Sequence, residues 1–151
     1  KLNCSIYTTI GNENKIDYIK KIGCNNILIH SKHNWYKELN NMKFDVIFEH
    51  IGKKTWDISL KLLNRGGTIV LCGATTGSNV VLNLKHLFYK QQSILGSTMG
   101  SIESFKNVIK GIEQKYYIPF VDKVFPINKI AEAHNYIENR QNKGKVVVSM
   151  L

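Results

Sequence analysis

The segment Gly66-Gly67-Thr68-Ile69-Val70-Leu71-Cys72-Gly73-Ala74-Thr75 decides the fold of this 151-residue chain. Its centre, Thr68–Leu71, is a short apolar run that follows two glycines, which is typical of a strand buried on both faces. The loop after the strand is rich in glycine and threonine. In open α/β sheets, ligands bind at the carboxyl ends of such strands. The segment therefore predicts a parallel sheet with a ligand site at one edge.

The sequence on both sides repeats this alternation of apolar strands and amphipathic helices. In the helix expected before the segment, Trp56, Leu60 and Leu63 share one face. We expect this helix to end at Arg65-Gly66-Gly67, with glycine as its C-cap. Strands between amphipathic helices predict a doubly wound α/β fold with both sheet faces covered. We expect strands at Cys4–Thr9, Asn26–His30, Lys43–Glu49, Thr68–Leu71, Ser93–Ser97, Asp122–Phe125 and Lys145–Met150, and helices at Asn14–Ile22, Trp35–Met42, Thr55–Asn64, Leu84–Lys90, from an N-cap Ser101 to Glu113, and at Ile130–Asn139 behind an Asn128 cap.

The composition is that of a globular protein with a strong positive charge. Hydrophobic residues make up 43% of the chain, enough for one core, and the formal net charge is +10. A basic chain invites a nucleic-acid interpretation. However, only two of the 21 basic residues are arginine, the better reader of phosphates and bases, and the lysines are scattered. A basic nucleic-acid-binding domain is therefore the least favoured alternative, and we expect no nucleic-acid partner.

The cysteine spacing and the hydropathy pattern exclude further classes of protein. Cys4, Cys24 and Cys72 are odd in number and lack a Cys-x-x-Cys spacing, so they cannot form a disulfide framework or a four-ligand zinc site. The histidines lack a metal-binding helix motif, and we expect no metal in this chain. Reduced thiols favour a cytoplasmic location. The longest apolar stretches, such as Thr68–Cys72 and Val146–Leu151, are far shorter than the ~20 residues that cross a bilayer, so we expect no membrane partner.

Four motifs, in order, carry a resemblance to a known superfamily. They resemble the cofactor domain of medium-chain dehydrogenases/reductases, in the branch of quinone oxidoreductase-like and zinc-binding alcohol dehydrogenase-like proteins. The resemblance runs over essentially the whole chain. The motifs are Val46-Ile47-Phe48-Glu49-His50-Ile51-Gly52, Gly66–Gly77, Ser93-Ile94-Leu95-Gly96-Ser97-Thr98-Met99-Gly100, and Ala131-Glu132-Ala133-His134 followed by Lys143-Gly144-Lys145-Val146-Val147.

The resemblance implies a partial Rossmann-like doubly wound parallel sheet over residues 1–118. Residues 119–151 would form a short strand-helix-strand tail that in relatives returns to the catalytic domain. The family's first strand and Gly-rich phosphate turn are absent, because Lys1-Leu2 resembles the end of the helix after that turn. The usual 3-2-1-4-5-6 sheet then has a gap between strands two and four. Either those two strands pair directly, or this chain is part of a longer one.

The resemblance also implies that the chain binds a nicotinamide dinucleotide. The residues at the end of the first expected strand bear on the choice between NAD(H) and NADP(H). An acidic residue at its end would favour NAD, but Gly11 and Asn12 stand there and the first carboxylate is Glu13. NADP-dependent members place a glycine, a lysine and a tyrosine at positions matching Gly11, Lys15 and His30. We therefore expect NADP(H) to be favoured over NAD(H), with Lys15 as an ordinary solvated helix residue the alternative.

The other expected cofactor-binding residues follow later strands. Gly52 and Gly73 would let the backbone approach the cofactor closely, unless they are simple turn glycines. Lys145 matches a basic residue that in some relatives reaches the cofactor from the final strand. No catalytic residue is assigned, because no nucleophile and base show a compelling spacing. The complete expected set is Gly11, Asn12, Lys15, His30, His50, Gly52, Cys72, Gly73, Ala74, Thr75, Thr98 and Lys145.

The leading functional hypothesis is the NADP(H)-binding portion of a quinone reductase-like or alcohol dehydrogenase-like oxidoreductase. Its expected partners are the dinucleotide, an N-terminal catalytic segment that this chain lacks, and a second copy that would pair through the strand near Ser93–Ser97. We expect little or no turnover from the chain alone. The alternative is a non-catalytic remnant, or a split-gene module that needs an upstream partner.

Overall fold

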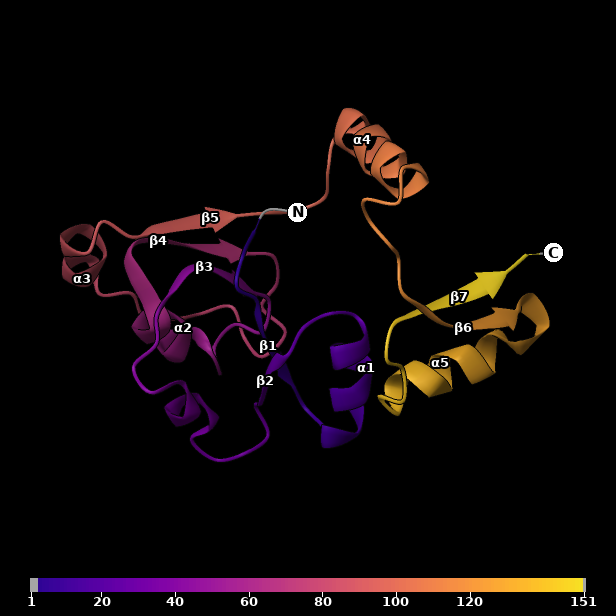
Figure 1. Cartoon of the computed structure of the whole chain (residues 1–151), viewed down its shortest axis with the longest axis horizontal. Coiled ribbons are helices and arrows are strands. Elements are labelled where there is room, and N and C mark those ends of the chain that lie inside the picture. Colours follow the sequence, from indigo (N-terminus) through magenta and orange to yellow (C-terminus); the bar gives the residue numbers. More distant parts are fainter. Residues whose placement is uncertain (1–2, 151) are drawn as a thin grey trace. The chain divides into compact units, whose positions relative to one another are not determined.

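The computed structural model describes residues 3–150, in which helices and strands alternate as the sequence predicts (Figure 1). The strands are β1 (Tyr7–Ile10), β2 (Asn26–Ile29), β3 (Phe44–Glu49), β4 (Leu63–Leu71), β5 (Ser93–Gly96), β6 (Val121–Pro126) and β7 (Lys145–Ser149). The α-helices are α1 (Ile16–Lys21), α2 (Trp56–Leu62), α3 (Leu84–Tyr89), α4 (Ile102–Glu113) and α5 (Ile130–Glu138), and the 3-10 helices are η1 (Glu13–Lys15), η2 (Trp35–Leu39) and η3 (Ile127–Lys129).

Within the described residues, the strands form three separate sheets, in the orders β1-β2, β3-β4-β5 and β6-β7. In the three-stranded sheet, β3 pairs with β4 and β4 pairs with β5 in parallel, and β6 and β7 are also parallel. This confirms the predicted α/β class with parallel sheets. The gap in the predicted strand order is also present, because β1 and β3 belong to different sheets. Direct pairing of the two strands that flank the gap is therefore not what the described residues adopt.

Contacts divide the chain into two compact units. One unit spans Leu28–Met99, and the other contains the chain up to Ile27 and from Gly100 onward. This grouping differs from the predicted division at residues 118 and 119, which refers to the organisation of longer relatives and stays a prediction. The expected cofactor-binding residues are consequently shared between the two units, and each unit is described here by itself.

The core of the Leu28–Met99 unit lies between α2 and one face of the β3-β4-β5 sheet. Trp56, Leu63 and Ile69 form this core, and Ile69 is fully buried. Ile47 of β3 packs against the same cluster. The Trp56 indole Nε1–H donates to the carbonyl of Val81 at 3.2 Å, so this ring also holds the segment that leads to α3. The apolar run that decided the fold thus supplies the centre of the sheet, as predicted.

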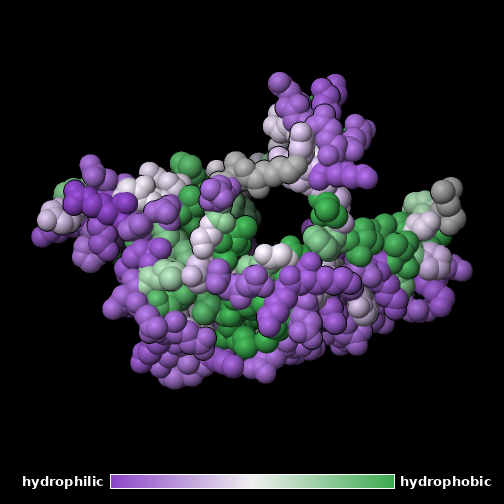
Figure 2. Space-filling model, viewed as in Figure 1, coloured by the Kyte–Doolittle hydropathy of each residue, from purple (hydrophilic) through white to green (hydrophobic). Residues whose placement is uncertain are grey.

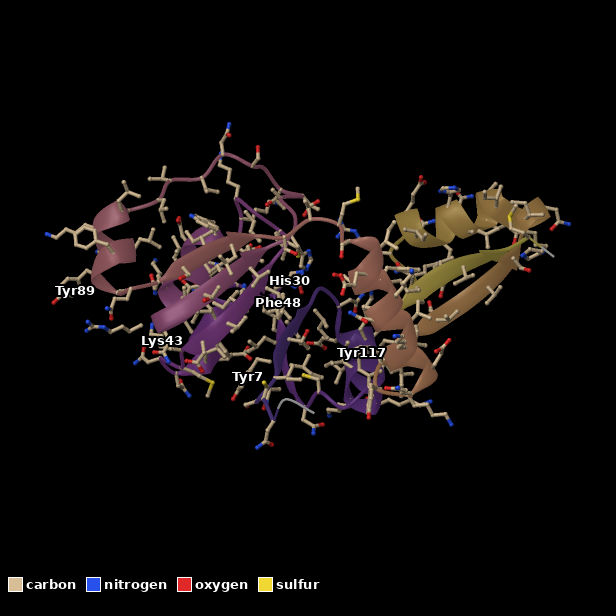
Figure 3. All side chains as sticks on the ribbon, turned by 90° about the horizontal axis from the view of Figure 1, so that it is seen from above. Tyr7, His30, Lys43, Phe48, Tyr89 and Tyr117 are labelled. Carbon is tan, nitrogen blue, oxygen red and sulfur yellow. The ribbon has the colours of Figure 1, made fainter. Side chains whose placement is uncertain are left out.

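The opposite face of the same sheet is uncovered within this unit. Val46 and Phe48 alternate with Ile47 along β3, so they lie on the face away from the core. Phe48 is 74% exposed (Figure 3), and Val46 and Leu95 are exposed as well. The expectation that both faces are covered is thus met on one face only, because α2, which covers the core face, has no counterpart in this unit.

The start of β4 corrects the prediction of a glycine C-cap. Helix α2 ends at Leu62, and Leu63 already has extended backbone angles and pairs with Phe44 of β3. Gly66, at φ +72°, lies inside β4, where the register shifts between Phe44 and Val46. The helix ends early because Leu63 joins the core from the strand, and the glycine accommodates the irregularity instead.

Other boundaries differ by a few residues. Strand β1 begins at Tyr7, three residues later than predicted, and the predicted helix Trp35–Met42 is only the 3-10 helix η2. Asn34 and Asn40 flank η2 in the left-handed region, which limits its length. Asn128 lies within η3 and does not cap α5, whose N-cap position is Lys129 without a side-chain bond. The predicted N-cap Ser101 is confirmed, because its Oγ accepts from the Ser104 N–H at 3.1 Å.

In the second unit, α5 connects the parallel strands β6 and β7 and covers one face of the pair. The rings of Phe125 and Tyr136 meet at 5.9 Å between centroids, and Phe125 is buried. The Tyr136 hydroxyl donates to Asp122 at 3.1 Å. The paired residues Val124 and Val147 are exposed. Figure 2 shows hydrophobic surface over this part of the chain. The predicted strand-helix-strand tail is thus present.

Helix α1 packs on the segments that precede β6 and β7. The rings of Tyr18 and Phe120 meet edge to face at 5.9 Å, and the Lys145 N–H donates to the Phe120 carbonyl at 2.7 Å. The Lys15 ammonium donates to the Asn142 carbonyl at 2.8 Å. A Cβ atom at Gly144 would lie 2.7 Å from both the Tyr18 hydroxyl oxygen and the Phe120 carbonyl oxygen. Glycine is therefore required for this close packing.

Among the described residues, no helix combines the length and hydrophobicity that crossing a membrane requires.

Replacing Gly144 by alanine tests the packing of α1. We expect Gly144→Ala to lower the free energy of unfolding by about 1–3 kcal/mol, because the new methyl group must displace a backbone carbonyl and a buried hydroxyl. Urea unfolding followed by circular dichroism measures the change. Gly100→Ala is the matched control, since its Cβ would meet only Ser104 at 3.9 Å. Equal stabilities of the two variants would contradict this packing.

Candidate functional site

The carboxyl ends of β3, β4 and β5 lie at one edge of their sheet because the three strands are parallel. Glu49 pairs with Leu71, and Leu71 pairs with Gly96. The ladder continues one residue further, where the Cys72 N–H donates to the Glu49 carbonyl at 3.0 Å and the Ser97 N–H donates to the Leu71 carbonyl at 2.9 Å. The loops that begin after these three strand ends are therefore neighbours, as the sequence predicts. We call the loops 50–54 and 73–77 the paired loops.

The side chain of Glu49 is buried at the base of the paired loops and is 3% exposed. Its carboxylate accepts from two backbone N–H groups, those of Ile51 at 2.8 Å and Gly52 at 3.1 Å. It also accepts from the hydroxyls of Thr55 at 2.9 Å and Ser59 at 2.6 Å. Four donors surround one carboxylate, which is what a buried charge requires. The last residue of β3 thus binds both the loop that follows it and the start of α2.

These contacts have opposing effects on the pKa of Glu49. Burial raises the pKa, whereas the hydrogen bonds from Ser59, Gly52, Ile51 and Thr55 lower it, and together they hold the pKa below its ordinary value of 4.5. Donors aimed at the oxygens favour the charged form. Glu49 is consequently an ionised carboxylate at neutral pH.

Backbone hydrogen bonds join the paired loops to each other. The Ile51 carbonyl accepts from the Thr76 N–H at 2.8 Å and from the Thr76 hydroxyl at 2.7 Å. In the opposite direction, the Lys53 N–H donates to the Gly77 carbonyl at 3.1 Å, and the Lys54 N–H donates to the Thr76 hydroxyl at 3.1 Å. The loop after β4 is therefore fixed by the loop after β3.

The predicted glycines allow this close approach of loop to loop. Gly52 has a φ of +90°, and a Cβ atom there would lie 2.6 Å from the Gly77 carbonyl oxygen and 2.9 Å from the Ala74 Cα. A Cβ atom at Gly73 would lie 3.0 Å from the His50 carbonyl oxygen. Both positions thus require a small residue for packing between the loops. Their closeness to a cofactor stays a prediction.

The sheet edge brings together most of the predicted cofactor-binding residues of the Leu28–Met99 unit. The exposed residues at this edge are His50, Cys72, Ala74, Thr75 and Thr98, whereas Gly73 is half-buried and Gly52 is buried. The Cys72 thiol lies 3.8 Å from the Glu49 carbonyl oxygen, which is consistent with a packing role. The remaining predicted residue of this unit, His30, is exposed just after β2 and is labelled in Figure 3.

The other predicted residues belong to the second unit. Asn12 caps η1, since its side-chain oxygen accepts from the Asn14 N–H at 3.1 Å, and Gly11 directly precedes it. Lys15, at the end of η1, donates one of its three ammonium N–H groups to the Asn142 carbonyl. Lys145 is exposed at the start of β7. Lys15 is therefore not an ordinary solvated lysine, because it holds a carbonyl from the other end of the chain.

Sequence patterns alone do not indicate the residues that organise the edge. Glu49 was placed at the edge only as part of a motif, and Thr55, Ser59 and Thr76 were not singled out. The sequence does contain one indication, a glutamate at the end of an apolar strand. A glutamate at such a position is rarely buried unless its carboxylate has hydrogen-bond or charge partners. Its donors, however, come from residues two, three, six and ten positions further on, and no periodic pattern indicates that set.

Among the described residues, no group of three or more histidine, cysteine, aspartate or glutamate side chains is placed to hold a metal ion.

Comparison with known proteins identifies the class to which this fold and edge belong. The chain matches the zinc-binding dehydrogenase family over residues 1–114, and it belongs to this family. It is 27% identical to a zinc-type alcohol dehydrogenase-like protein of Schizosaccharomyces pombe, over 97% of this chain and 45% of the relative. It is 26% identical to the quinone oxidoreductase of Rattus norvegicus, over 93% of this chain and 45% of the relative.

A solved structure of an NAD-dependent alcohol dehydrogenase matches with a TM-score of 0.80 and 31% identity, over 95% of this chain and 43% of that one. These findings confirm the resemblance to medium-chain dehydrogenases/reductases. The relatives are oxidoreductases, and the chain spans less than half of their length.

Alanine at Gly52 tests the packing of the paired loops. We expect Gly52→Ala to lower the free energy of unfolding by about 2–4 kcal/mol, through a strained positive φ and overlap with backbone atoms. Gly66→Ala is the matched control in the same unit, because Gly66 has a φ of +72° but nothing within 4 Å of its Cβ position. Urea unfolding of both variants separates strain from overlap. A Gly52→Ala variant no less stable than Gly66→Ala would contradict the loop packing.

The lowered pKa of Glu49 predicts a specific dependence of stability on pH. A depressed pKa adds stability that is fully present above the unfolded-state value near 4.5 and is lost as the pH falls through the lower folded-state value. We expect the free energy of unfolding of the wild type to fall more steeply below about pH 4.5 than that of Glu49→Gln. Urea unfolding at several pH values between neutral and about 3 measures both curves. Parallel curves would show that Glu49 does not contribute.

Proposed function

We propose that this chain is the NADP(H)-binding portion of an oxidoreductase that transfers hydride, of the quinone reductase-like or alcohol dehydrogenase-like kind. The observation that carries the proposal is the edge where β3, β4 and β5 end, with its rigid paired loops. Parallel α/β sheets bind dinucleotides at this position. Membership of the zinc-binding dehydrogenase family supports the same conclusion.

The residues present at the edge fit a dinucleotide. His50, Cys72, Ala74 and Thr75 are exposed, and they follow two neighbouring strands whose loops are fixed to each other. Exposed backbone on a rigid loop can approach a phosphate or a sugar without an ordering cost at binding. The nicotinamide would supply the hydride chemistry itself. These residues would bind it and set its orientation.

The preference for NADP(H) over NAD(H) is part of the proposal. No carboxylate stands at the end of β1, where Gly11 and Asn12 follow the strand. The Lys15 ammonium is held in place by the Asn142 carbonyl and has two further N–H donors for a 2′-phosphate. A like-charged aspartate at this position would repel that phosphate, whereas a fixed ammonium attracts it.

The sheet arrangement supports a second candidate, a module that binds nucleotide only when another segment completes the sheet. Among the described strands, β1 pairs with β2 and β3 pairs with β4, so each sheet keeps an edge strand beside the gap in the predicted order. An edge strand can accept a further strand from another segment. The homodimer expected through Ser93–Ser97 stays a prediction and would use the other edge strand, β5.

A nucleotide titration of the 151-residue chain tests the proposal. We expect NADPH to bind more tightly than NADH in isothermal titration calorimetry. We expect Lys15→Ala to weaken NADPH about tenfold, which is about 1.4 kcal/mol, and to leave NADH unchanged. Lys20→Ala, an exposed lysine in the last turn of α1, is the control.

Equal affinities for the two nucleotides would contradict the NADP(H) preference. Binding of neither nucleotide by the folded wild-type chain would favour the second candidate, the module that needs a further segment.

A further inference from the structure

We propose that Glu49 is a positioning residue for nucleotide binding: its carboxylate fixes the backbone of Ile51 and Gly52, and through them the loop that carries Ala74 and Thr75. The inference rests on the proposed function of this edge. Under this proposal, Glu49 sets the conformation of the loops at the binding edge, although its side chain does not contact the ligand.

The burial of Glu49 excludes direct contact with a nucleotide. The side chain is 3% exposed, and its two oxygens already accept from four donors of the chain itself. A direct role would also place a carboxylate against phosphates, which is unfavourable. Glu49 can therefore act on binding only through the groups that it holds.

The connection from Glu49 to the exposed loop is short and has little freedom. The carboxylate holds the N–H groups of Ile51 and Gly52, and the Ile51 carbonyl holds Thr76 by two hydrogen bonds. Gly52 sits so close to Ala74 that a Cβ atom would lie 2.9 Å from the Ala74 Cα. Any movement of the Ile51-Gly52 backbone must therefore move the 74–77 segment, and a displacement of about 1 Å is enough to impair a binding geometry.

The alternative is that Glu49 only stabilises the fold, since Thr55 and Ser59 belong to the start of α2. Gln92 offers a comparison, because it is the other long polar side chain buried in this unit. Its Nε2 donates to the carbonyls of Leu63 and Asn64, both at 3.1 Å. These groups lie near the amino ends of β4 and β5, away from the edge where the strands end.

The experiment compares Glu49→Ala, Glu49→Gln and Gln92→Ala. Glu49→Ala and Gln92→Ala each truncate a buried polar side chain and leave two backbone groups without that partner. Glu49→Gln keeps an oxygen that can accept from the two backbone N–H groups. For each folded variant, NADPH affinity is measured by calorimetry, stability by urea unfolding, and local opening by amide hydrogen exchange at Ile51, Gly52 and Thr76.

We expect Glu49→Ala to weaken NADPH binding by at least about tenfold, Glu49→Gln by less than about threefold, and Gln92→Ala not at all. We also expect faster exchange at the three amides in Glu49→Ala but wild-type exchange there in Gln92→Ala. Equal weakening by the two alanine variants would overturn the proposal, because it would follow lost stability alone. Wild-type affinity in Glu49→Ala would overturn it as well.

Two further outcomes keep the inference separate from the function on which it rests. If Glu49→Ala does not fold, Thr76→Val decides, because it removes the hydroxyl hydrogen bond from Thr76 to the Ile51 carbonyl. Weaker NADPH binding than in Gln92→Ala would support the proposal, and wild-type affinity would overturn it. If the wild type binds no nucleotide, the proposed function fails. The exchange data then show by themselves whether Glu49 holds the paired loops.

Discussion

The need to satisfy one buried carboxylate shapes the part of this protein that carries its candidate site. Among the described residues, Glu49 is the charged side chain that the fold buries. Removing a carboxylate from water costs several kcal/mol unless hydrogen bonds replace the lost hydration. Here the replacements are two backbone N–H groups just beyond the strand and two hydroxyls at the start of α2. The chain can bury Glu49 only by turning back over it, so the same constraint sets the direction of the loop, the start of the helix and the position of the sheet edge.

Two kinds of interaction build this edge: apolar packing between α2 and one face of the sheet, and hydrogen bonds in the paired loops where the strands end. Trp56, Leu63 and Ile69 fix α2 against the sheet by burial of apolar surface, which is strong but not directional. Hydrogen bonds from Glu49 and between Ile51 and Thr76 add direction where the strands end. Apolar packing therefore decides that α2 and the sheet meet, and the polar network decides how the loops emerge. A binding edge needs both, because affinity depends on loops that are already ordered before a ligand arrives.

The order and type of the elements could be predicted because they depend on local patterns. Apolar runs predict each strand found in residues 3–150, and the prediction of Ser101 as an N-cap is confirmed. Predictions failed where a distant contact decides a local choice. Leu63 leaves the helix because it joins the core from β4, so Gly66 is not a C-cap. Lys15 is held by a carbonyl 127 residues away, and neither spacing nor composition indicates such a partner. For the site, the strand ends were predictable, and the hydrogen-bond network beneath them was not.

The glycines of the site have a packing role that does not depend on any binding role. Gly52 was expected to let a cofactor approach the backbone, yet the atoms nearest to its Cβ position are those of Ala74 and Gly77. Packing of one loop on another is thus sufficient to require glycine there, independently of any ligand. Glu49 and Gly52 belong to the same seven-residue motif, and both serve this packing. The resemblance of the motif to dehydrogenases then reflects how the edge is built. The proposed binding of NADP(H) depends instead on the exposed residues that this construction presents.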